Sequence, residues 1–236
     1  MQLFYGHREG DRVLLSEDES KHAVKVLRKS VGDELHVFDG KGNLYIGRIV
    51  DNHPKHCGIT IDSIEENWGS LPYSFHLAIA PTKNMDRLEW LVEKAVEIGI
   101  SRITPLLCEH SERKVLKPAR LERILLSATK QSLKGTLPQL DELTPFKEFV
   151  EAEREYPTYI GYCGDGEKTP LHKAMRTEGS SVCVMIGPEG DFSPAEFERA
   201  IAAGITGITL GDQRMRTETA GLAAVHTAHL NHISQL

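Results

Sequence analysis

Closely spaced cysteines are absent from this sequence, which has four cysteines in 236 residues. No Cys-x-x-Cys pair occurs, so neither a zinc-binding framework nor a disulfide scaffold is expected. Histidines occur in the turn 53–57 and along the C-terminal segment, but no further ligands accompany them, and we predict no metal site. Cys108, Cys163 and Cys183 lie in apolar runs and are expected to be small core residues.

Long apolar runs are also missing. No segment approaches the roughly 20 residues that a membrane-spanning helix needs. Residues 1–7 have neither the apolar stretch nor the cleavage-like site of a secretory leader. Together with the scattered cysteines, this predicts a cytoplasmic protein without a membrane partner.

An excess of positive charge, the usual mark of a nucleic-acid-binding protein, is lacking, because the formal net charge is −6. Two local segments, however, carry an excess of positive charge. Residues 20–30 carry basic side chains and no acid, and residues 111–135 carry seven basic and two acidic ones. Such segments either contact phosphates or form solvated helix faces. The candidate phosphate contacts are Lys21, Lys25, Arg28, Arg120, Arg123, Lys130 and Lys134.

The pattern of the chain changes near residue 70, which predicts two domains, 1–70 and 71–236. Before this point, β-like segments dominate and one short helix, 19–27, interrupts them, as is typical of a small β-barrel or sandwich. The expected strands are 12–15, 34–38, 44–50 and 58–64.

After residue 70, β-like and helix-like segments alternate, which predicts an α/β domain with a mostly parallel sheet covered on both faces. Ser193-Pro194-Ala195-Glu196 is a capping box that begins a helix. The expected strands are 74–80, 103–108, 158–163, 182–186 and 207–210, and the other helices are 85–98, a segment around 121–128, and 217–233.

Two glycine-rich segments, 186–193 and 210–220, each follow an expected strand and lead into an expected helix. In an open α/β sheet, ligands bind beyond the carboxyl ends of the strands. Glycine lets the backbone approach a ligand closely. Because Arg214, Arg216 and Glu218 crowd the second segment, the sequence predicts one small-molecule pocket built from two neighbouring strand exits.

These segments carry a resemblance to a known family. Gly187–Glu196 and Leu210–Ala220 resemble the RsmE family of 16S ribosomal RNA uridine-N3 methyltransferases, which belongs to the knotted SPOUT superfamily. Further family segments match at His22–Arg28, Glu93–Ile100 and Ala128–Ser132, so the likeness runs nearly from end to end.

This sequence departs from the family pattern at two places. Asp191 stands where the family commonly has glycine. The family commonly reads Arg-Ile-Leu-Arg where this chain reads Gln213-Arg214-Met215-Arg216, so the first arginine is displaced by one position. The role of Arg214 is therefore open, whereas Arg216 keeps its place.

The resemblance implies a PUA-like N-terminal β-barrel and a SPOUT α/β domain whose C-terminal chain forms a trefoil knot. It also implies a homodimer, to which the small-residue last helix could contribute, although intrachain packing would explain that helix equally well. The implied cofactor is S-adenosylmethionine (S-adenosyl-L-methionine). The positions that match the cofactor pocket are Tyr162, Gly187, Glu189, Gly190, Leu210, Gly211, Met215, Arg216, Thr217, Thr219 and Ala220.

The implied reaction is methylation of N3 of a specific uridine in 16S rRNA of the small ribosomal subunit. Uridine N3 carries a proton that must leave, so a base or an anion-stabilising cation is required. The candidate catalytic residues are Arg216 and Glu218. Arg216 either stabilises the uridine anion or positions a base, and Glu218 either orients Arg216, accepts the proton or complements a helix dipole. Two alternatives stay open: a catalytically silent RNA-binding module, and a related enzyme acting on tRNA or ribose 2′-hydroxyls.

Overall fold

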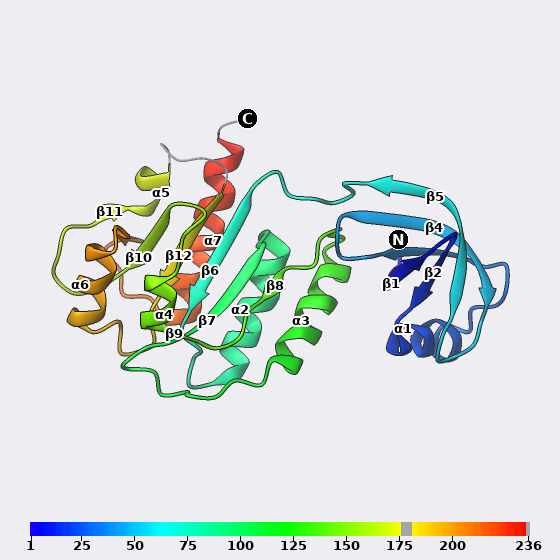
Figure 1. Ribbon diagram of the computed structural model, residues 1–236, viewed down its shortest axis with the longest axis horizontal. Coiled ribbons are helices and arrows are strands. Elements are labelled where there is room, and N and C mark those ends of the chain that lie inside the picture. Colours follow the sequence, from blue (N-terminus) through cyan, green and yellow to red (C-terminus); the bar gives the residue numbers. More distant parts are fainter. Residues whose placement is uncertain (176–180, 235–236) are drawn as a thin grey trace. The chain divides into compact units, whose positions relative to one another are not determined.

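The computed structural model describes residues 1–175 and 181–234, and these form two compact units (Figure 1). The first unit contains residues 1–71 and 126–137, and the second contains residues 72–125 and 138–236. Among the described residues, no helix combines the length and apolar character needed to cross a membrane.

The first unit is a closed five-stranded barrel in the order β1-β2-β5-β4-β3. Its barrel closes through parallel pairing of β1 with β3, and its other pairings are antiparallel. The side chains of Phe4, Val13 and Ile59 are among those that fill its core. The strands are β1 (Leu3–Glu9), β2 (Arg12–Leu15), β3 (Glu34–Phe38), β4 (Asn43–Asp51) and β5 (Gly58–Glu66).

β1 was not expected from the sequence. Gly6 lies in the middle of this strand, and glycine usually weakens a strand interior. In the barrel, however, a Cβ on Gly6 would lie 2.5 Å from the Leu14 carbonyl oxygen of β2. The close approach of the two strands therefore requires glycine at this position.

The single helix expected at residues 19–27 is two elements. The α-helix α1 (Glu17–Lys21) runs directly into a π-helical segment, η1 (His22–Val26). The Ser16 side chain caps α1 by accepting a hydrogen bond from the Glu19 N–H. Arg28, just after η1, has a positive φ of 55°.

Residues 126–137 belong to the barrel unit although they are distant in sequence. Leu137 N donates to Gly40 O at 2.9 Å, and Gly42 N donates to Gly135 O at 3.0 Å. A Cβ on Gly135 would lie 1.7 Å from the Trp68 carbonyl oxygen, so this junction accepts glycine alone without rearrangement. The segment includes the second half of helix α3 (Pro118–Gln131).

The second unit contains a parallel sheet in the order β11-β13-β10-β12-β6-β7-β8, with β9 also paired to β7. Every pairing described in it is parallel, as predicted. The main strands are β6 (Ser74–Ile79), β7 (Arg102–Leu107), β10 (Thr158–Gly161), β12 (Ser181–Ile186) and β13 (Thr206–Thr209). The short ones are β8 (Gln139–Leu140), β9 (Thr144–Pro145) and β11 (Thr169–Pro170).

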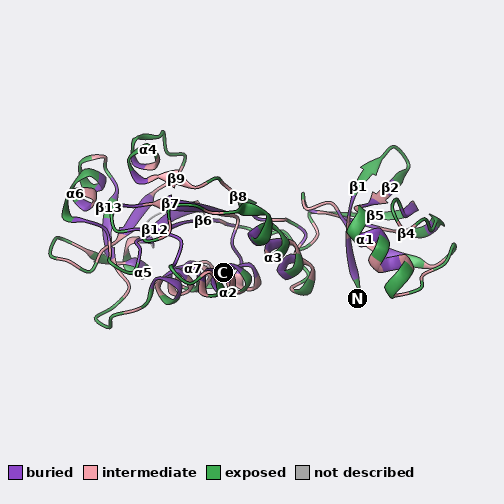
Figure 2. Cartoon of the chain, turned by 90° about the horizontal axis from the view of Figure 1, so that it is seen from below, coloured by how far each residue is buried: buried purple, intermediate pink, exposed green. Residues whose placement is uncertain are grey.

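Helices cover both faces of this sheet (Figure 2). Helices α2 (Met85–Ile98) and α7 (Thr217–Ile233) lie on one face, and α4 (Phe146–Glu151) and α6 (Pro194–Ala202) on the other. The short helix α5 (Leu171–Ala174) contacts α7. α6 begins with the predicted capping box, since Ser193 and Glu196 exchange hydrogen bonds.

The last helix packs within its own chain. A Cβ on Gly221 of α7 would lie 2.9 Å from a methyl of Ile79 and 3.0 Å from one of Leu91. The glycine therefore allows α7 to approach both β6 and α2 closely. This contact accounts for part of the small-residue pattern of α7.

Candidate active site

Three loops meet at one pocket of the second unit, with a volume of about 930 Å³. They follow β10, β12 and β13, and therefore lie at the carboxyl edge of the sheet, where ligands bind in open α/β folds. The prediction that both glycine segments line one pocket agrees with this geometry. Their strands are not neighbours, however, because β10 lies between β12 and β13 and adds a third loop.

The loop after β12 is a tight turn from Gly187 to Asp191. A Cβ on Gly187 would lie 2.9 Å from Phe192 N, so the turn closes on itself there. Asp191 has a positive φ of 63°, a conformation in which glycine is the most common residue and aspartate is tolerated. Its carboxylate accepts hydrogen bonds from Cys163 N at 2.8 Å and from Phe192 N at 2.9 Å. The departure at Asp191 thus links two of the three loops.

Neighbouring loops brace this turn. Lys83 N donates to Glu189 Oε1 at 2.9 Å, and His110 Nδ1 lies 3.1 Å from Gly190 O. Arg113 donates to the carbonyl oxygens of Thr82 and Lys83. Segments that follow β6 and β7 therefore hold the pocket wall in place.

The loop after β13 is stabilised by Thr209. Its hydroxyl donates to Gly211 O at 2.8 Å and accepts from Gly211 N at 3.2 Å. Gly211 has a φ of 137°, which L side chains rarely adopt, and a Cβ there would meet no atom within 4 Å. Because Gly211 lines the pocket, its bare backbone leaves room for a ligand.

The loop after β10 begins at Tyr162. Its ring stacks on Phe197 with the centroids 4.2 Å apart. Cys163 follows and is exposed, so the prediction that it is a core residue is wrong. The apolar run that suggested a core position ends with β10 at Gly161, and Cys163 lies in the loop beyond it. Cys108 and Cys183 are buried, as predicted.

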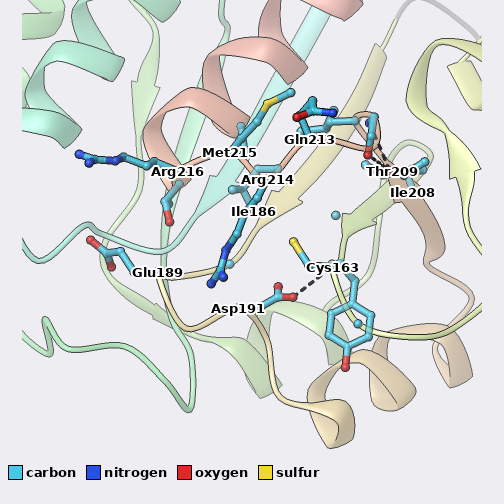
Figure 3. A pocket seen from close by; sticks show the side chains of 18 of the residues that line it. Cys163, Ile186, Glu189, Asp191, Ile208, Thr209, Gln213, Arg214, Met215 and Arg216 are labelled. Atoms are coloured by element: carbon cyan, nitrogen blue, oxygen red, sulfur yellow. Dashed lines mark hydrogen bonds between the residues drawn. The ribbon is translucent and has the colours of Figure 1, made fainter.

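Two arginines reach the pocket from the last loop. Arg214 and Arg216 both line it, and neither forms an ion pair or side-chain hydrogen bond with any residue in 1–175 or 181–234. In Figure 3, Arg214 extends toward the side where Glu189 and Asp191 lie, whereas Arg216 points away from Arg214. The two guanidinium groups therefore face different parts of the site.

Glu218 does not join Arg216. It is the second residue of α7, is 7% exposed, and does not line the pocket. Its Oε1 lies 3.7 Å from Arg87 Nε of α2, and its Oε2 is buried without a hydrogen-bond partner within the described part of the chain. Thr219 is exposed and also lies outside the pocket lining.

Apart from Glu218 and Thr219, the predicted catalytic and cofactor residues line the pocket. Ten of the predicted cofactor positions line it: Tyr162, Gly187, Glu189, Gly190, Leu210, Gly211, Met215, Arg216, Thr217 and Ala220. Sequence reasoning missed Lys168 and Thr209, among others. Lys168 lies in a glycine-rich segment after β10, which was the available signal.

Comparisons with known proteins support the resemblance. An RNA methyltransferase domain model matches residues 69–229, and an RNA methyltransferase PUA domain model matches residues 15–62. The ribosomal RNA small subunit methyltransferase E of Buchnera aphidicola is 30% identical over 88% of this chain and 84% of its own length. The chain belongs to this methyltransferase E (RsmE) family.

Solved structures agree with this membership. A Porphyromonas gingivalis protein described as a "probable rRNA-methyltransferase" has a TM-score of 0.87 and 36% identity, with all of both chains covered. The Neisseria gonorrhoeae ribosomal RNA small subunit methyltransferase E, bound to S-adenosylmethionine, has a TM-score of 0.80 and 26% identity over 95% of each chain. The PUA-like barrel and the parallel α/β domain are thus the family fold.

The RsmE pocket of this chain suits S-adenosylmethionine. Its volume lies within the range of about 300–1,000 Å³ that is usual for cofactor sites. The glycine backbone of the three loops offers N–H and C=O groups for a purine edge, and Ile186, Ile208 and Leu210 offer apolar contact. The open space beside Gly211 allows a ligand to lie against the main chain.

The predicted RNA-contact residues differ in their surroundings. Lys25, Arg28 and Arg123 are exposed and have no side-chain partner within residues 1–175 and 181–234. Lys21 pairs with Glu17 at 2.8 Å, and Arg120 pairs with Glu89 at 2.6 Å. Lys130 forms a largely buried ion pair, and Lys134 is half-buried.

Proposed function

We propose that this protein transfers a methyl group from S-adenosylmethionine to N3 of a specific uridine in the 16S rRNA of the small ribosomal subunit. The observation that carries the proposal is the pocket in which three glycine-containing loops meet Arg216. Family membership supports the substrate class, because the curated relatives are named ribosomal RNA small subunit methyltransferase E.

In the reaction, S-adenosylmethionine supplies an electrophilic methyl group. The protein must hold the uridine so that N3 faces that group and can lose its proton. We assign Arg216 to the stabilisation of the uridine anion, since its guanidinium reaches the site and has no described protein partner. Its backbone is fixed, because Arg216 O accepts a hydrogen bond from Ala220 N at 2.8 Å.

Glu218 is better suited to positioning than to proton transfer. Its carboxylate is buried against Arg87, outside the pocket lining. At the second position of α7 it also complements the positive end of the helix. We therefore assign Glu218 to holding the start of α7, and with it Arg216, in place.

The target base must leave its stack, because N3 lies on the Watson–Crick edge of uridine. We assign residues 1–70 to RNA binding and residues 71–236 to methyl transfer. Phosphates would contact the exposed basic groups of the barrel unit, Lys21, Lys25 and Arg28, and those of α3, Arg120 and Arg123. A C-terminal trefoil knot, a homodimer and a cytoplasmic location belong to the same proposal.

The decisive experiment is mass mapping of modified nucleosides in RNA from a strain that lacks this protein. Loss of one 3-methyluridine from 16S rRNA, restored by the wild-type gene and not by an Arg216→Ala gene, is the expected result. An unchanged 16S rRNA with a modification missing from tRNA, or a missing 2′-O-methyl group, would refute the proposal. Calorimetry with S-adenosylmethionine separates the enzyme from a silent RNA-binding module, which would show no binding.

A further inference from the structure

Arg214 is a charged group for which the reaction just described has no use. It stands one position away from the arginine that the family commonly has, and it reaches the pocket from the loop between β13 and α7. Arg216 points in another direction (Figure 3). The two guanidinium groups therefore face different parts of the site.

The acidic side chains of the pocket do not neutralise Arg214. The lining holds Glu189, Asp191 and Asp212, but none forms an ion pair with an arginine within 4.0 Å across residues 1–175 and 181–234. Glu189 and Asp191 instead accept hydrogen bonds from backbone N–H groups. Arg214 is an exposed residue of the pocket lining, and its guanidinium therefore keeps its N–H donors available to a ligand.

A guanidinium in such a place is complementary to a ligand carboxylate or phosphate, which it can bind with two parallel hydrogen bonds. In Figure 3 the side chain of Arg214 extends toward Asp191 of the loop after β12. Because Asp191 accepts a hydrogen bond from Cys163 N of the loop after β10, Arg214 faces the place where the loops after β10 and β12 meet. S-adenosylmethionine carries one such group, the carboxylate of its amino-acid end.

Resting on the proposed function, we propose that Arg214 binds the α-carboxylate of S-adenosylmethionine and so selects donors that carry the amino-acid end. Asp191, the other departure from the family pattern, lies across the same pocket. Both departures from the family pattern therefore line the same pocket. Arg216 is left to act on the uridine.

The test compares two donors that differ in this carboxylate alone. Calorimetry with S-adenosylmethionine and with decarboxylated S-adenosylmethionine is carried out on the wild-type protein and on Arg214→Ala, Arg214→Lys and the control Lys147→Ala. Lys147 is an exposed cation of α4 that does not line the pocket. Thermal unfolding of each variant verifies that the fold is retained.

We expect Arg214→Ala to weaken binding of S-adenosylmethionine about tenfold or more and to leave the affinity for the decarboxylated donor unchanged. Arg214→Lys keeps the positive charge but loses the paired N–H donors of the guanidinium. Its affinity for S-adenosylmethionine should therefore lie between those of the wild type and of Arg214→Ala. Lys147→Ala should resemble wild type. The difference between the effects of Arg214→Ala on the two donors is the coupling free energy of the side chain and the carboxylate, and it measures the proposed contact directly.

Equal weakening of both donors, or no change in either, would overturn the assignment. Binding of a labelled single-stranded oligouridylate is measured in parallel. If Arg214→Ala weakens this RNA and leaves both donors unaffected, Arg214 contacts a phosphate and the proposal is wrong. If the wild-type protein binds neither donor, the proposed function itself is wrong. If the wild-type protein binds both donors and Arg214→Ala changes neither affinity, only the Arg214 contact is wrong.

Discussion

Lys130 Nζ lies 2.5 Å from Glu19 Oε1, although the two residues are 111 positions apart in the chain. Their side chains are 20% and 9% exposed, and Glu19 Oε2 has no hydrogen-bond partner in the described part of the protein. Lys130 Nζ also lies 5.9 Å from the centre of the Phe4 ring. Lys130 therefore links residues 126–137 to the barrel, and its positive charge is largely compensated by Glu19.

Removing the lysine should leave a buried carboxylate without a counter-ion. We expect Lys130→Ala to lower the free energy of unfolding by roughly 3 kcal/mol, because breaking a buried pair costs more than an exposed one. Urea denaturation measures this loss. The double variant Glu19→Gln with Lys130→Met should recover much of it, and a single variant as stable as wild type would contradict the buried-pair interpretation.

RNA binding should depend on exposed cations of the barrel unit instead. We expect Lys25→Gln with Arg28→Asn to weaken RNA binding and to reduce the slope of log K against log salt by about 1.5, since about two phosphate contacts are lost. Asparagine suits position 28, because it tolerates the positive φ of Arg28. Fluorescence anisotropy with an rRNA fragment at several salt concentrations gives the slope.

Lys147→Gln is the matched control for that experiment. It removes an exposed positive charge from α4 and should leave the slope unchanged. A slope that stays at the wild-type value in the Lys25 and Arg28 double variant would show that the RNA surface lies elsewhere.

Local signals in the sequence predicted much of this fold. The bounds of α7, the capping box at Ser193 and Glu196, and the main strands of the second unit agree within two residues. Helix caps and hydrophobic periodicity depend on residues that are close together in the chain, and they can therefore be recognised in the amino-acid sequence.

Features that depend on distant residues were not visible. The placement of β10 between β12 and β13 is a property of strand order, and the inclusion of 126–137 in the barrel depends on contacts such as Gly135 with Trp68. Likewise, the direction of Glu218 toward Arg87 follows from the packing of α7 on α2. Sequence proximity alone suggested that Glu218 and Arg216 act together.

Arg216 should matter more for turnover than for cofactor binding. If it stabilises charge that develops on the uridine, Arg216→Ala should lower kcat by about 100- to 1,000-fold, and the affinity for S-adenosylmethionine should change little. Single-turnover methylation of rRNA and calorimetry separate the two quantities. Equal losses in both would mean that Arg216 serves mainly to bind the cofactor.

His76 should make the stability of the second unit sensitive to mild acid. It is 4% exposed, and its Nε2 lies 2.6 Å from Thr104 Oγ1 while its Nδ1 lies 2.9 Å from Tyr156 Oη. The Thr104 hydroxyl donates to Asp141, so the threonine oxygen is left to accept from His76 Nε2–H, and Nδ1 accepts from Tyr156. The neutral imidazole thus satisfies both contacts.

Burial, assisted by the charge of Arg102, lowers the pKa of His76 from 6.5 to about 4. The unfolded chain therefore binds an extra proton between these two values, and stability falls as the pH falls through that window. We expect the free energy of unfolding to fall by roughly 2 kcal/mol between pH 7 and pH 5 because of this residue, as measured by urea denaturation.

Two variants serve as controls. His76→Gln should flatten the pH dependence of stability even if it lowers stability overall, whereas His7→Gln, at an exposed position, should preserve that dependence. An NMR titration in which the His76 ring protonates near pH 6.5 in the folded protein would contradict this account.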